Sequence, residues 1–169
     1  MNSKDRRDEI QKLLYLSKYP IKGGVLASRF SVTRQVIVKD IAILRAEGLN
    51  IIATPDGYIF NKLRDLYKRV FAIHHSKDDI KIELETIIKY GGIIEDIIVE
   101  HPLYGEIKAM IMIKTLDDIN KFLKTFDESN AIPLSILTEG IHLHTISAET
   151  EEILDKIEKN LSKSGFILE

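Results

Sequence analysis

The spacing of apolar residues in the first 61 residues constrains the fold more than any other feature of the chain. In residues 5–18, Ile10, Leu13 and Leu14 stand at i, i+3 and i+4, and Ser17 follows at i+7. This spacing predicts an amphipathic helix that ends before Pro20. The same kind of spacing predicts a short second helix over residues 24–30 and a third helix from Thr33 to about Glu47. The chain is therefore expected to begin with three amphipathic helices.

A β hairpin is expected after the third helix, which Gly48 ends. Residues 49–53 and 57–61 are β-rich, and the sequence Thr54-Pro55-Asp56-Gly57 between them favours a turn. Proline presets one backbone angle of such a turn, and glycine tolerates the left-handed region that other residues avoid. The order of elements is thus three helices followed by a hairpin.

The third helix has two chemically different faces. Its apolar residues at helical spacing are expected to face inward: Val36, Ile37, Ile41 and Leu44. Thr33 is placed to cap the first turn of the helix. This leaves an outer face near the start of the helix, made of Arg34, Gln35, Val38 and Lys39.

Charge is divided unequally along the 169 residues, and the length allows two small domains. Residues 1–65 contain 12 Lys+Arg and 7 Asp+Glu, whereas residues 66–169 contain 12 and 19. The basic part favours a polyanionic partner, although a charge of this size can also be a solvated surface. We expect a first domain over residues 1–63 and a second over residues 66–169.

Composition excludes several classes of protein. Cysteine is absent, so disulfides, thiolate metal sites and a cysteine nucleophile are excluded. No apolar run reaches 18 residues, so neither a spanning helix nor a secretory signal is expected, and the protein is expected to be cytoplasmic. A metal ion in this chain would need imidazole, carboxylate or water as ligands.

Residues 66–169 alternate between strand-like and helix-like segments. They predict an α+β sandwich, with helices packed on a mostly antiparallel sheet. Strands are expected over residues 70–74, 93–101, 104–114, 140–147 and 166–168, and helices over residues 77–90, 116–126 and 148–162. Residues 132–137 have no clear assignment, and residues 62–69 are expected to be a charged connector.

The histidines point to one kind of chemistry. All five lie after residue 73, and His142 and His144 alternate within one predicted strand, so both imidazoles point to the same face. His75 at a strand end and Glu83 in the following helix could meet them, giving three imidazoles and one carboxylate. That set suits Zn²⁺, Ni²⁺, Fe²⁺ or Co²⁺ better than Mg²⁺ or Ca²⁺. The alternative is that these histidines are ordinary polar residues of a half-exposed strand.

The residues of the third helix resemble those of the winged helix-turn-helix of bacterial regulators, in the run Thr33-Arg34-Gln35, Lys39-Asp40-Ile41, Leu44-Arg45 and Gly48. The resemblance implies that the outer face of this helix enters the major groove of DNA. Arg34 could then pair with guanine and Gln35 with adenine, while Lys39 and Arg45 are placed for phosphates. Thr33 and Val38 complete the expected DNA-binding set.

Two features depart from that pattern. Ser31 stands where glycine is common in the turn, and the hairpin is short, with only Asp56 and Tyr58 near its tip. Contacts between the hairpin and DNA are therefore doubtful on sequence alone. The alternative is that the polar residues of the third helix are the solvated outside of an ordinary three-helix bundle.

The acidic part resembles the 3H domain in three stretches: Gly91-Gly92, residues 99–105 and residues 133–145. Joined to the helix-turn-helix, it is similar to the niacin-responsive transcriptional repressors of the NiaR family. The resemblance implies a homodimeric repressor of NAD-biosynthesis and niacin-uptake genes that binds operator DNA with nicotinic acid as co-repressor. It also implies a transition metal ion held by His75, Glu83, His142 and His144, and no enzymatic activity.

Further roles follow as hypotheses from this resemblance. The nicotinic acid could take an open metal position, with His101 and Tyr104 lining the pocket as effector-binding residues. Alternatively, His101 has a structural role in the turn His101-Pro102-Leu103-Tyr104-Gly105. Two other functions stay open: a repressor that senses the metal itself, and a metal-dependent hydrolase with Glu83 or Glu100 as general base.

Overall fold

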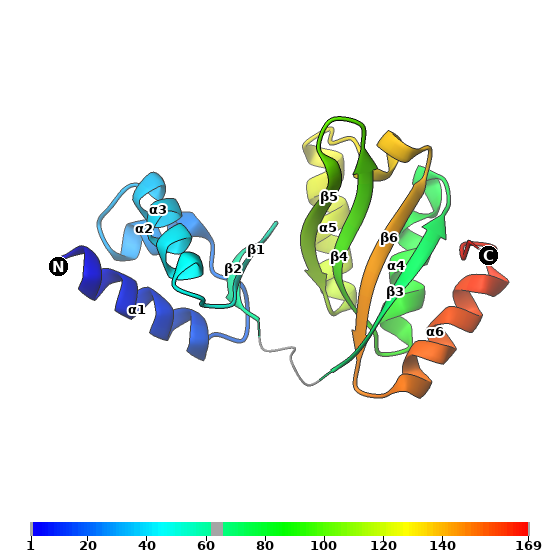
Figure 1. Ribbon diagram of the computed structural model, residues 1–169, viewed down its shortest axis with the longest axis horizontal. Helices are drawn as coiled ribbons and strands as arrows, with labels where there is room; N and C mark the ends of the chain where they lie inside the picture. The colour runs from blue at the N-terminus through cyan, green and yellow to red at the C-terminus, as the bar shows by residue number, and fades with distance from the viewer. Residues whose placement is uncertain (1, 62–65, 169) are drawn as a thin grey trace. The chain divides into compact units, whose positions relative to one another are not determined.

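The computed structural model describes residues 2–61 and 66–168. The chain divides into two compact units, residues 1–64 and 65–169, each with its own core (Figure 1). The boundary expected from the sequence, between residues 63 and 66, falls on residues 62–65, which lie outside the described residues. The expected fold class, a helix-turn-helix unit followed by an α+β unit with an antiparallel sheet, is confirmed.

The N-terminal unit has three helices and a hairpin in the expected order: α1 (Ser3–Leu16), α2 (Gly23–Arg29), α3 (Arg34–Ala46), β1 (Ile51–Thr54) and β2 (Gly57–Phe60). Their inner faces form one core of Ile10, Leu14, Leu26, Ala27, Ile37, Ile41, Leu44 and Ile51. Val36, expected to face inward, is only half-buried. The spacing of apolar residues therefore predicted the three helices correctly. It overestimated the burial of Val36.

The turn between α2 and α3 has the backbone that a helix-turn-helix requires. Ser31 adopts a positive φ of 52°, the left-handed conformation for which glycine is the usual residue. Thr33 then caps α3, because its hydroxyl accepts a hydrogen bond from the backbone N–H of Val36. Serine thus occupies the glycine position of this turn without changing its geometry.

The hairpin β1–β2 is closed at its expected turn. Gly57 has a φ of 128°, and a Cβ at this position would lie 2.4 Å from the carbonyl oxygen of Ile21. The neighbouring residue Tyr58 exchanges two backbone hydrogen bonds with Ile21, which joins the hairpin to the segment before α2. Glycine is required here both by backbone conformation and by this close approach.

A buried ion pair joins α1 to α3. Asp40 points away from the outer face of α3, and its side chain is 3% exposed. Arg6 Nε donates to Asp40 Oδ2 at 2.6 Å, and Arg6 Nη2 donates to Asp40 Oδ1 at 3.3 Å. Arg7 lies farther away, with its Nη1 atom 3.9 Å from Asp40 Oδ1. The aspartate of the helix-turn-helix pattern therefore holds α3 in place and does not belong to the outer face.

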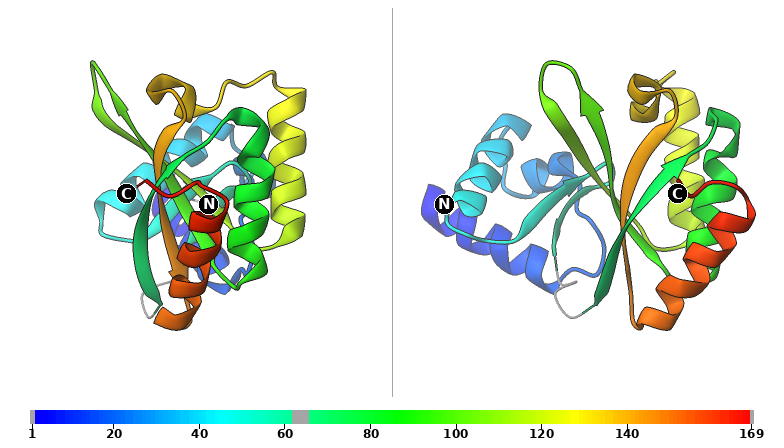
Figure 2. Two further views of the ribbon diagram at one scale, coloured as in Figure 1. Left: turned by 90° about the vertical axis from the view of Figure 1, so that its right-hand side faces the viewer. Right: turned by 45° about the vertical axis from the view of Figure 1, so that its right-hand side comes forward.

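The C-terminal unit is a four-stranded antiparallel sheet in the order β3-β6-β4-β5. Its strands are β3 (Tyr67–His74), β4 (Ile93–His101), β5 (Gly105–Ile113) and β6 (Ile141–Ala148). Three helices cover one face of the sheet: α4 (Ile80–Lys89), α5 (Leu116–Glu128) and α6 (Glu151–Lys163) (Figure 2). The core lies between the sheet and these helices, around Ile73, Leu84, Ile94, Ile146 and Ile157.

Three segments of this unit differ from the sequence prediction. β3 begins at Tyr67, so residues 67–69 belong to the strand and not to the connector. The unassigned residues form a 3-10 helix, η3 (Leu134–Thr138). The expected last strand is reduced to one bridge between Ile167 and Ile73, flanked by hydrogen bonds at Phe166 and Leu168.

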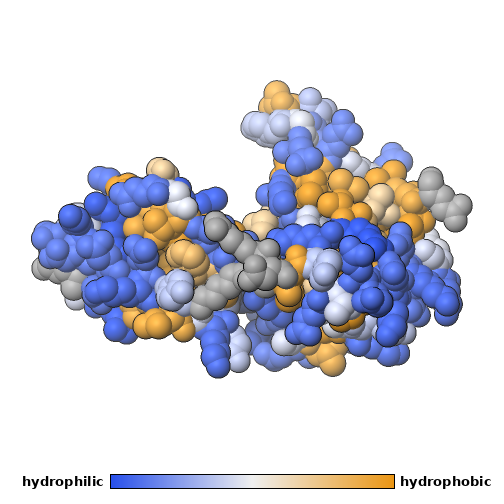
Figure 3. Space-filling view, turned by 60° about the horizontal axis from the view of Figure 1, so that its bottom comes forward, coloured by the Kyte–Doolittle hydropathy of each residue, from blue (hydrophilic) through white to orange (hydrophobic). Residues whose placement is uncertain are grey.

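Among the described residues, no helix is both long enough and apolar enough to cross a bilayer. Hydrophilic residues dominate the visible face of each unit, with apolar residues in smaller patches between them (Figure 3).

We predict that Arg6→Ala destabilises the N-terminal unit by about 3 kcal/mol, because it leaves the buried Asp40 carboxylate without its main partner. Hydrogen exchange of the backbone amides of α1 and α3 measures this loss. Arg7→Ala is the control and should cost less than about 1 kcal/mol, since Arg7 is more distant and more exposed. Equal losses in the two variants would show that the 2.6 Å contact is not the important one.

Candidate metal and effector site

The histidine strand β6 directs two imidazoles into the interior of the C-terminal unit. His142 and His144 both lie on the face of the sheet that the helices cover, and they are 3% and 2% exposed. Their partners across the ladder, Ile73 and Phe71, belong to the neighbouring strand β3. The alternation expected from His142-Leu143-His144 therefore places both rings side by side, with their centroids 4.9 Å apart.

The other two residues of the cluster come from the segment after β3. His75 directly follows the strand, and the 3-10 helix η2 (Lys77–Asp79) then turns the chain into α4. Glu83 lies in the first turn of α4 and points back toward the strand end. The connection is short, so the imidazole of His75 and the carboxylate of Glu83 meet with Nε2 and Oε2 2.7 Å apart.

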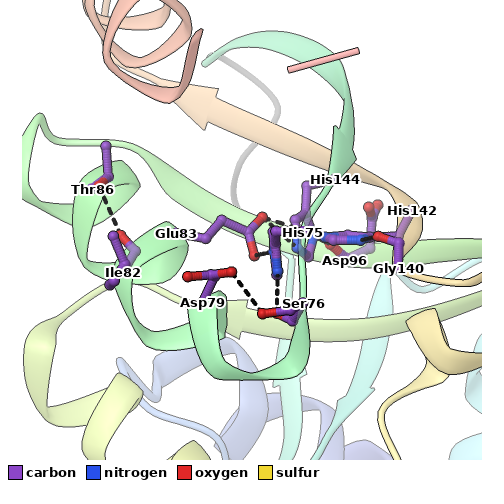
Figure 4. Close-up of polar contacts among 10 residues, drawn as sticks. All are labelled: His75, Ser76, Asp79, Ile82, Glu83, Thr86, Asp96, Gly140, His142 and His144. Carbon is purple, nitrogen blue, oxygen red and sulfur yellow. Dashed lines mark hydrogen bonds and ion pairs between the residues drawn. The ribbon is translucent and has the colours of Figure 1, made fainter. Parts of the chain in front are cut away.

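Glu83 is the centre of the four-residue cluster (Figure 4). Its Oε1 atom lies 3.1 Å from His144 Nε2 and 3.5 Å from His142 Nε2. One donor atom from each of His75, Glu83 and His142 lies within 4.8 Å of the others, and His144 joins them through its contact with Glu83. The four side chains that the sequence singled out are therefore brought together and buried.

Each imidazole is fixed through its second nitrogen. The Nδ1 atoms of His75 and His142 lie 2.7 Å and 2.9 Å from the carbonyl oxygens of Ser76 and Gly140, and His144 Nδ1 contacts the carbonyl oxygen of Asp96. A carbonyl only accepts, so each Nδ1 carries a proton and donates it. In the neutral ring, Nε2 then presents a lone pair toward the cluster.

This arrangement requires positive charge at the centre of the cluster. Lone pairs of three Nε2 atoms would face the oxygens of an ionised carboxylate, and acceptors facing acceptors repel. Either protons on Nε2 or a cation between the groups removes the repulsion. Histidines that ligate metals commonly donate their second N–H to a carbonyl or carboxylate, as all three do here.

The chemistry of the donors fits a transition metal ion. In tetrahedral coordination, zinc–nitrogen bonds of about 2.0–2.1 Å place neighbouring ligand atoms about 3.3–3.4 Å apart. The three contacts of Glu83 with imidazole nitrogens span 2.7–3.5 Å. Imidazole and carboxylate together suit Zn²⁺, Ni²⁺, Fe²⁺ or Co²⁺.

The pKa values of the metal-free cluster shift in the directions that its charges dictate. Burial by itself would raise the pKa of Glu83 and lower the pKa of His75 and His144. Their mutual contacts outweigh burial. The histidines hold the pKa of Glu83 well below 4.5, and Glu83 raises the pKa of His75 and His144 above 6.5. Without metal, the cluster therefore keeps its protons to a higher pH than isolated imidazoles do.

Two residues outside the cluster hold its members in register. Gly140 has a φ of 94°, and a Cβ there would lie 2.5 Å from the carbonyl oxygen of His75, so only glycine lets the two segments approach. Asp96 lies in β4 where the pairing register with β6 shifts. Its Oδ1 atom accepts from the N–H of Thr145 at 2.8 Å, and Lys108 Nζ lies 2.8 Å from its Oδ2.

The cluster opens into a cavity of about 240 Å³ between the sheet and the helices. Its wall is mostly apolar and comes from the sheet, α4, α5 and residues 131–135: Ile80, Leu84, Ile97, Ala109, Ile111, Phe122, Phe126, Ala131, Ile132, Pro133, Leu134 and Ser135. This volume lies below the range of about 300–1,000 Å³ typical of drug-sized ligands, so it suits one small ring. Sequence reasoning missed these walls, because they come from segments far apart in the chain.

His101 and Tyr104, which were expected to line the effector pocket, do not belong to the wall of this cavity. They lie at the turn between β4 and β5, where Tyr104 is 73% exposed. His101 Nδ1 accepts hydrogen bonds from the N–H groups of Leu103 and Tyr104 at 3.1 and 3.2 Å. The structural alternative for His101 therefore accounts for its position, since the hairpin carries it away from the cluster.

The expected DNA-binding residues form one exposed face of α3. Thr33, Arg34, Gln35, Lys39 and Arg45 are all exposed, and Val38 is 40% exposed. Within the described parts of the chain, the side chains of Arg34, Lys39 and Arg45 have no ion-pair partner. Three cations and one amide are thus free to bind phosphate or base edges.

Comparisons with known proteins match both units. A 3H domain family matches residues 68–169, and an HTH domain family matches residues 6–59. The probable transcription repressor NiaR of Thermotoga maritima is 42% identical over 165 residues, which cover 98% of this chain and 94% of that protein. The transcription repressor NadR of Bacillus subtilis is 36% identical over 168 residues, which cover 97% and 93%. An uncharacterized protein of Methanothermus fervidus is 38% identical over 101 residues, or 56% of this chain and 16% of that protein.

The chain belongs to the NiaR family of transcription repressors. Membership assigns DNA binding to the N-terminal unit and repression of transcription to the protein. The NiaR and NadR relatives are named as repressors, which agrees with the expectation that the chain is not an enzyme. The hydrolase alternative is therefore dropped.

We predict that Glu83→Gln lowers the pKa of His75 and His144 in chelator-treated protein, since burial remains while the raising carboxylate is lost. In the native sequence, the raised pKa values of His75 and His144 contribute to the free energy of unfolding. This contribution is fully present below pH 6.5 and is lost as the pH rises through the raised pKa values. Titration of the imidazole signals by NMR measures the pKa values.

Glu85→Gln is the matched control, since Glu85 lies on the same helix but its side chain is 45% exposed and pairs with Lys81 at 3.8 Å. It should leave both histidine pKa values unchanged. Unchanged pKa values in Glu83→Gln would contradict the electrostatic account of the cluster.

Proposed function

We propose that this repressor controls genes of niacin uptake and NAD biosynthesis, and that nicotinic acid is its co-repressor. The observation that carries the proposal is a buried cluster of three imidazoles and one carboxylate that opens into a small apolar cavity. Its family membership and the names of its relatives support the regulatory role.

The metal ion belongs to the same proposal. His75, Glu83, His142 and His144 would hold it through their Nε2 and carboxylate atoms, each imidazole being fixed by a backbone carbonyl. When bound, the metal would supply a positive Lewis-acidic centre that attracts an anionic carboxylate. Binding should release protons, because the raised pKa values of His75 and His144 favour their protonated forms in the metal-free site.

The cavity wall supports a planar aromatic acid as effector. Phe122 and Phe126 of α5 and Ile97 of β4 offer apolar contacts to a ring, while the polar cluster lies to one side. A single-ring carboxylate can therefore bury its ring against the wall and direct its charge toward the cluster. Larger nucleotides exceed what a cavity of about 240 Å³ can enclose.

A homodimer completes the proposal. Two recognition helices about 34 Å apart, one turn of DNA, would bind the two halves of a pseudo-palindromic operator. Coupling between effector and operator affinity is expected at about 1–3 kcal/mol, and linkage makes it reciprocal.

We predict that nicotinic acid tightens operator binding only when the metal is bound. Fluorescence anisotropy with promoter DNA of niacin-uptake genes at fixed salt, using metal-loaded and chelator-treated protein, measures this dependence. A coupling of about 1–3 kcal/mol corresponds to a roughly 5–150-fold gain in affinity. If metal alone controlled binding and nicotinic acid had no effect, the protein would be a metal sensor and the co-repressor proposal would be wrong.

We predict different effects from two exposed residues of α3. Arg34→Ala should weaken operator binding and relax base preference at one position by about 1–3 kcal/mol. Lys39→Ala should instead weaken binding to all sequences alike and reduce the salt dependence by about one phosphate contact. Competition titrations with operator and scrambled DNA at several salt concentrations distinguish the two. Neither residue contacts the core, so unaltered binding in both variants would mean that α3 does not read DNA.

A further inference from the structure

Ser135 is a buried polar residue whose hydroxyl has no partner. It lies in η3, is 8% exposed and lines the cavity beside the histidine cluster. Its backbone oxygen accepts from Gly140 N–H at 2.7 Å and from Thr138 Oγ1 at 3.3 Å. Its hydroxyl makes no hydrogen bond to any residue in the described parts of the chain. Its oxygen remains accessible to solvent, so a ligand atom in the cavity can take the place of water as its partner.

The polar groups of the cavity wall are divided between two places. Among the described lining residues, all polar side chains belong to the histidine cluster except that of Ser135. The cluster is supplied by β3, α4 and β6, whereas Ser135 comes from the segment between α5 and β6. A ligand that pairs with both the histidine cluster and Ser135 must therefore carry two polar groups on an apolar skeleton.

The histidine cluster and Ser135 differ in chemistry, so each suits a different polar group of the ligand. The cluster requires positive charge at its centre, so it attracts an anionic group. A hydroxyl can donate a hydrogen bond to a neutral acceptor such as an aromatic ring nitrogen, which has a lone pair in the ring plane. A pyridine carboxylate carries both groups, whereas benzoate has the carboxylate and lacks the nitrogen.

We propose that Ser135 is a specificity-determining residue that donates a hydrogen bond to the ring nitrogen of a pyridine carboxylate. The proposal rests on the proposed function, because it needs an aromatic acid in this cavity. It adds that the carboxylate faces the histidines and the ring nitrogen faces η3. Ser135 then distinguishes pyridine acids from benzoic acids, because benzoate would displace water from the hydroxyl without pairing with it.

The test combines one change in the protein with one in the ligand. Calorimetric titrations of the full-length, metal-loaded protein with nicotinate and benzoate are made for the native sequence and for Ser135→Ala. The native protein should bind nicotinate about tenfold more tightly than benzoate, as expected for one hydrogen bond to a buried group. Ser135→Ala should lose about tenfold in nicotinate affinity while its benzoate affinity changes less than about twofold.

Two further variants separate recognition from packing. Ser135→Thr keeps the hydroxyl and should retain part of the preference for nicotinate. Thr138→Ala removes hydrogen bonds from Thr138 to the carbonyls of Ser135 and Ile141 without removing a residue of this cavity wall. If it loosens η3, it should weaken both ligands alike and leave their ratio unchanged.

Each outcome bears on one of the two proposals. If Ser135→Ala weakens both acids equally, or weakens neither, the role of Ser135 is wrong while binding of nicotinate stands. If the native protein binds nicotinate and benzoate equally well, the ring nitrogen is not recognised and the inference is overturned. If the native protein binds neither acid, the proposed effector itself is wrong.

Discussion

The carboxylate of Glu83 among three imidazoles is the interaction on which the C-terminal unit depends. Glu83 is 1% exposed, and a buried charge without a partner costs several kcal/mol, so β3, α4 and β6 must hold the four side chains together. The backbone carbonyls of Ser76, Gly140 and Asp96 fix the rings. The geometry that satisfies this buried charge therefore also presents three imidazole nitrogens to one point.

Much of the fold and the cluster could be predicted from the sequence, for physical reasons that differ between residues. Helical spacing identified α1 to α3, and the period of two in a strand placed His142 and His144 on one face. Spacing could not show that β3 pairs with β6, because distant strands are joined by packing and not by local pattern. Spacing left the meeting of His75 and Glu83 with the histidine strand as one of two alternatives, and the family resemblance favoured it.

Residues that depend on long-range packing could not be predicted. The family resemblance suggested His101 and Tyr104 as pocket residues. The hairpin β4–β5 instead places them at an exposed turn. Ser135 belongs to a stretch that resembles the family, but a single serine has no spacing that reveals an unpaired hydroxyl. Its environment exists only once residues 131–135 are folded against α5 and the sheet.

In the proposed function, the burial of the cluster favours different roles for the metal ion and for the organic acid. The three histidines of the cluster and Glu83 are at most 7% exposed. A cation among them can therefore exchange only through the cavity or by local opening. Ile132 of the cavity wall is 73% exposed, which places the entrance for a small acid on the surface. A ligand shifts an equilibrium only through contacts that differ between the two states. An acid that bridged α5, residues 131–135 and the cluster would make such contacts, while a permanently bound cation would hold the cluster in both states. This argues for the organic acid as the signal and for the metal as the constant part of the site.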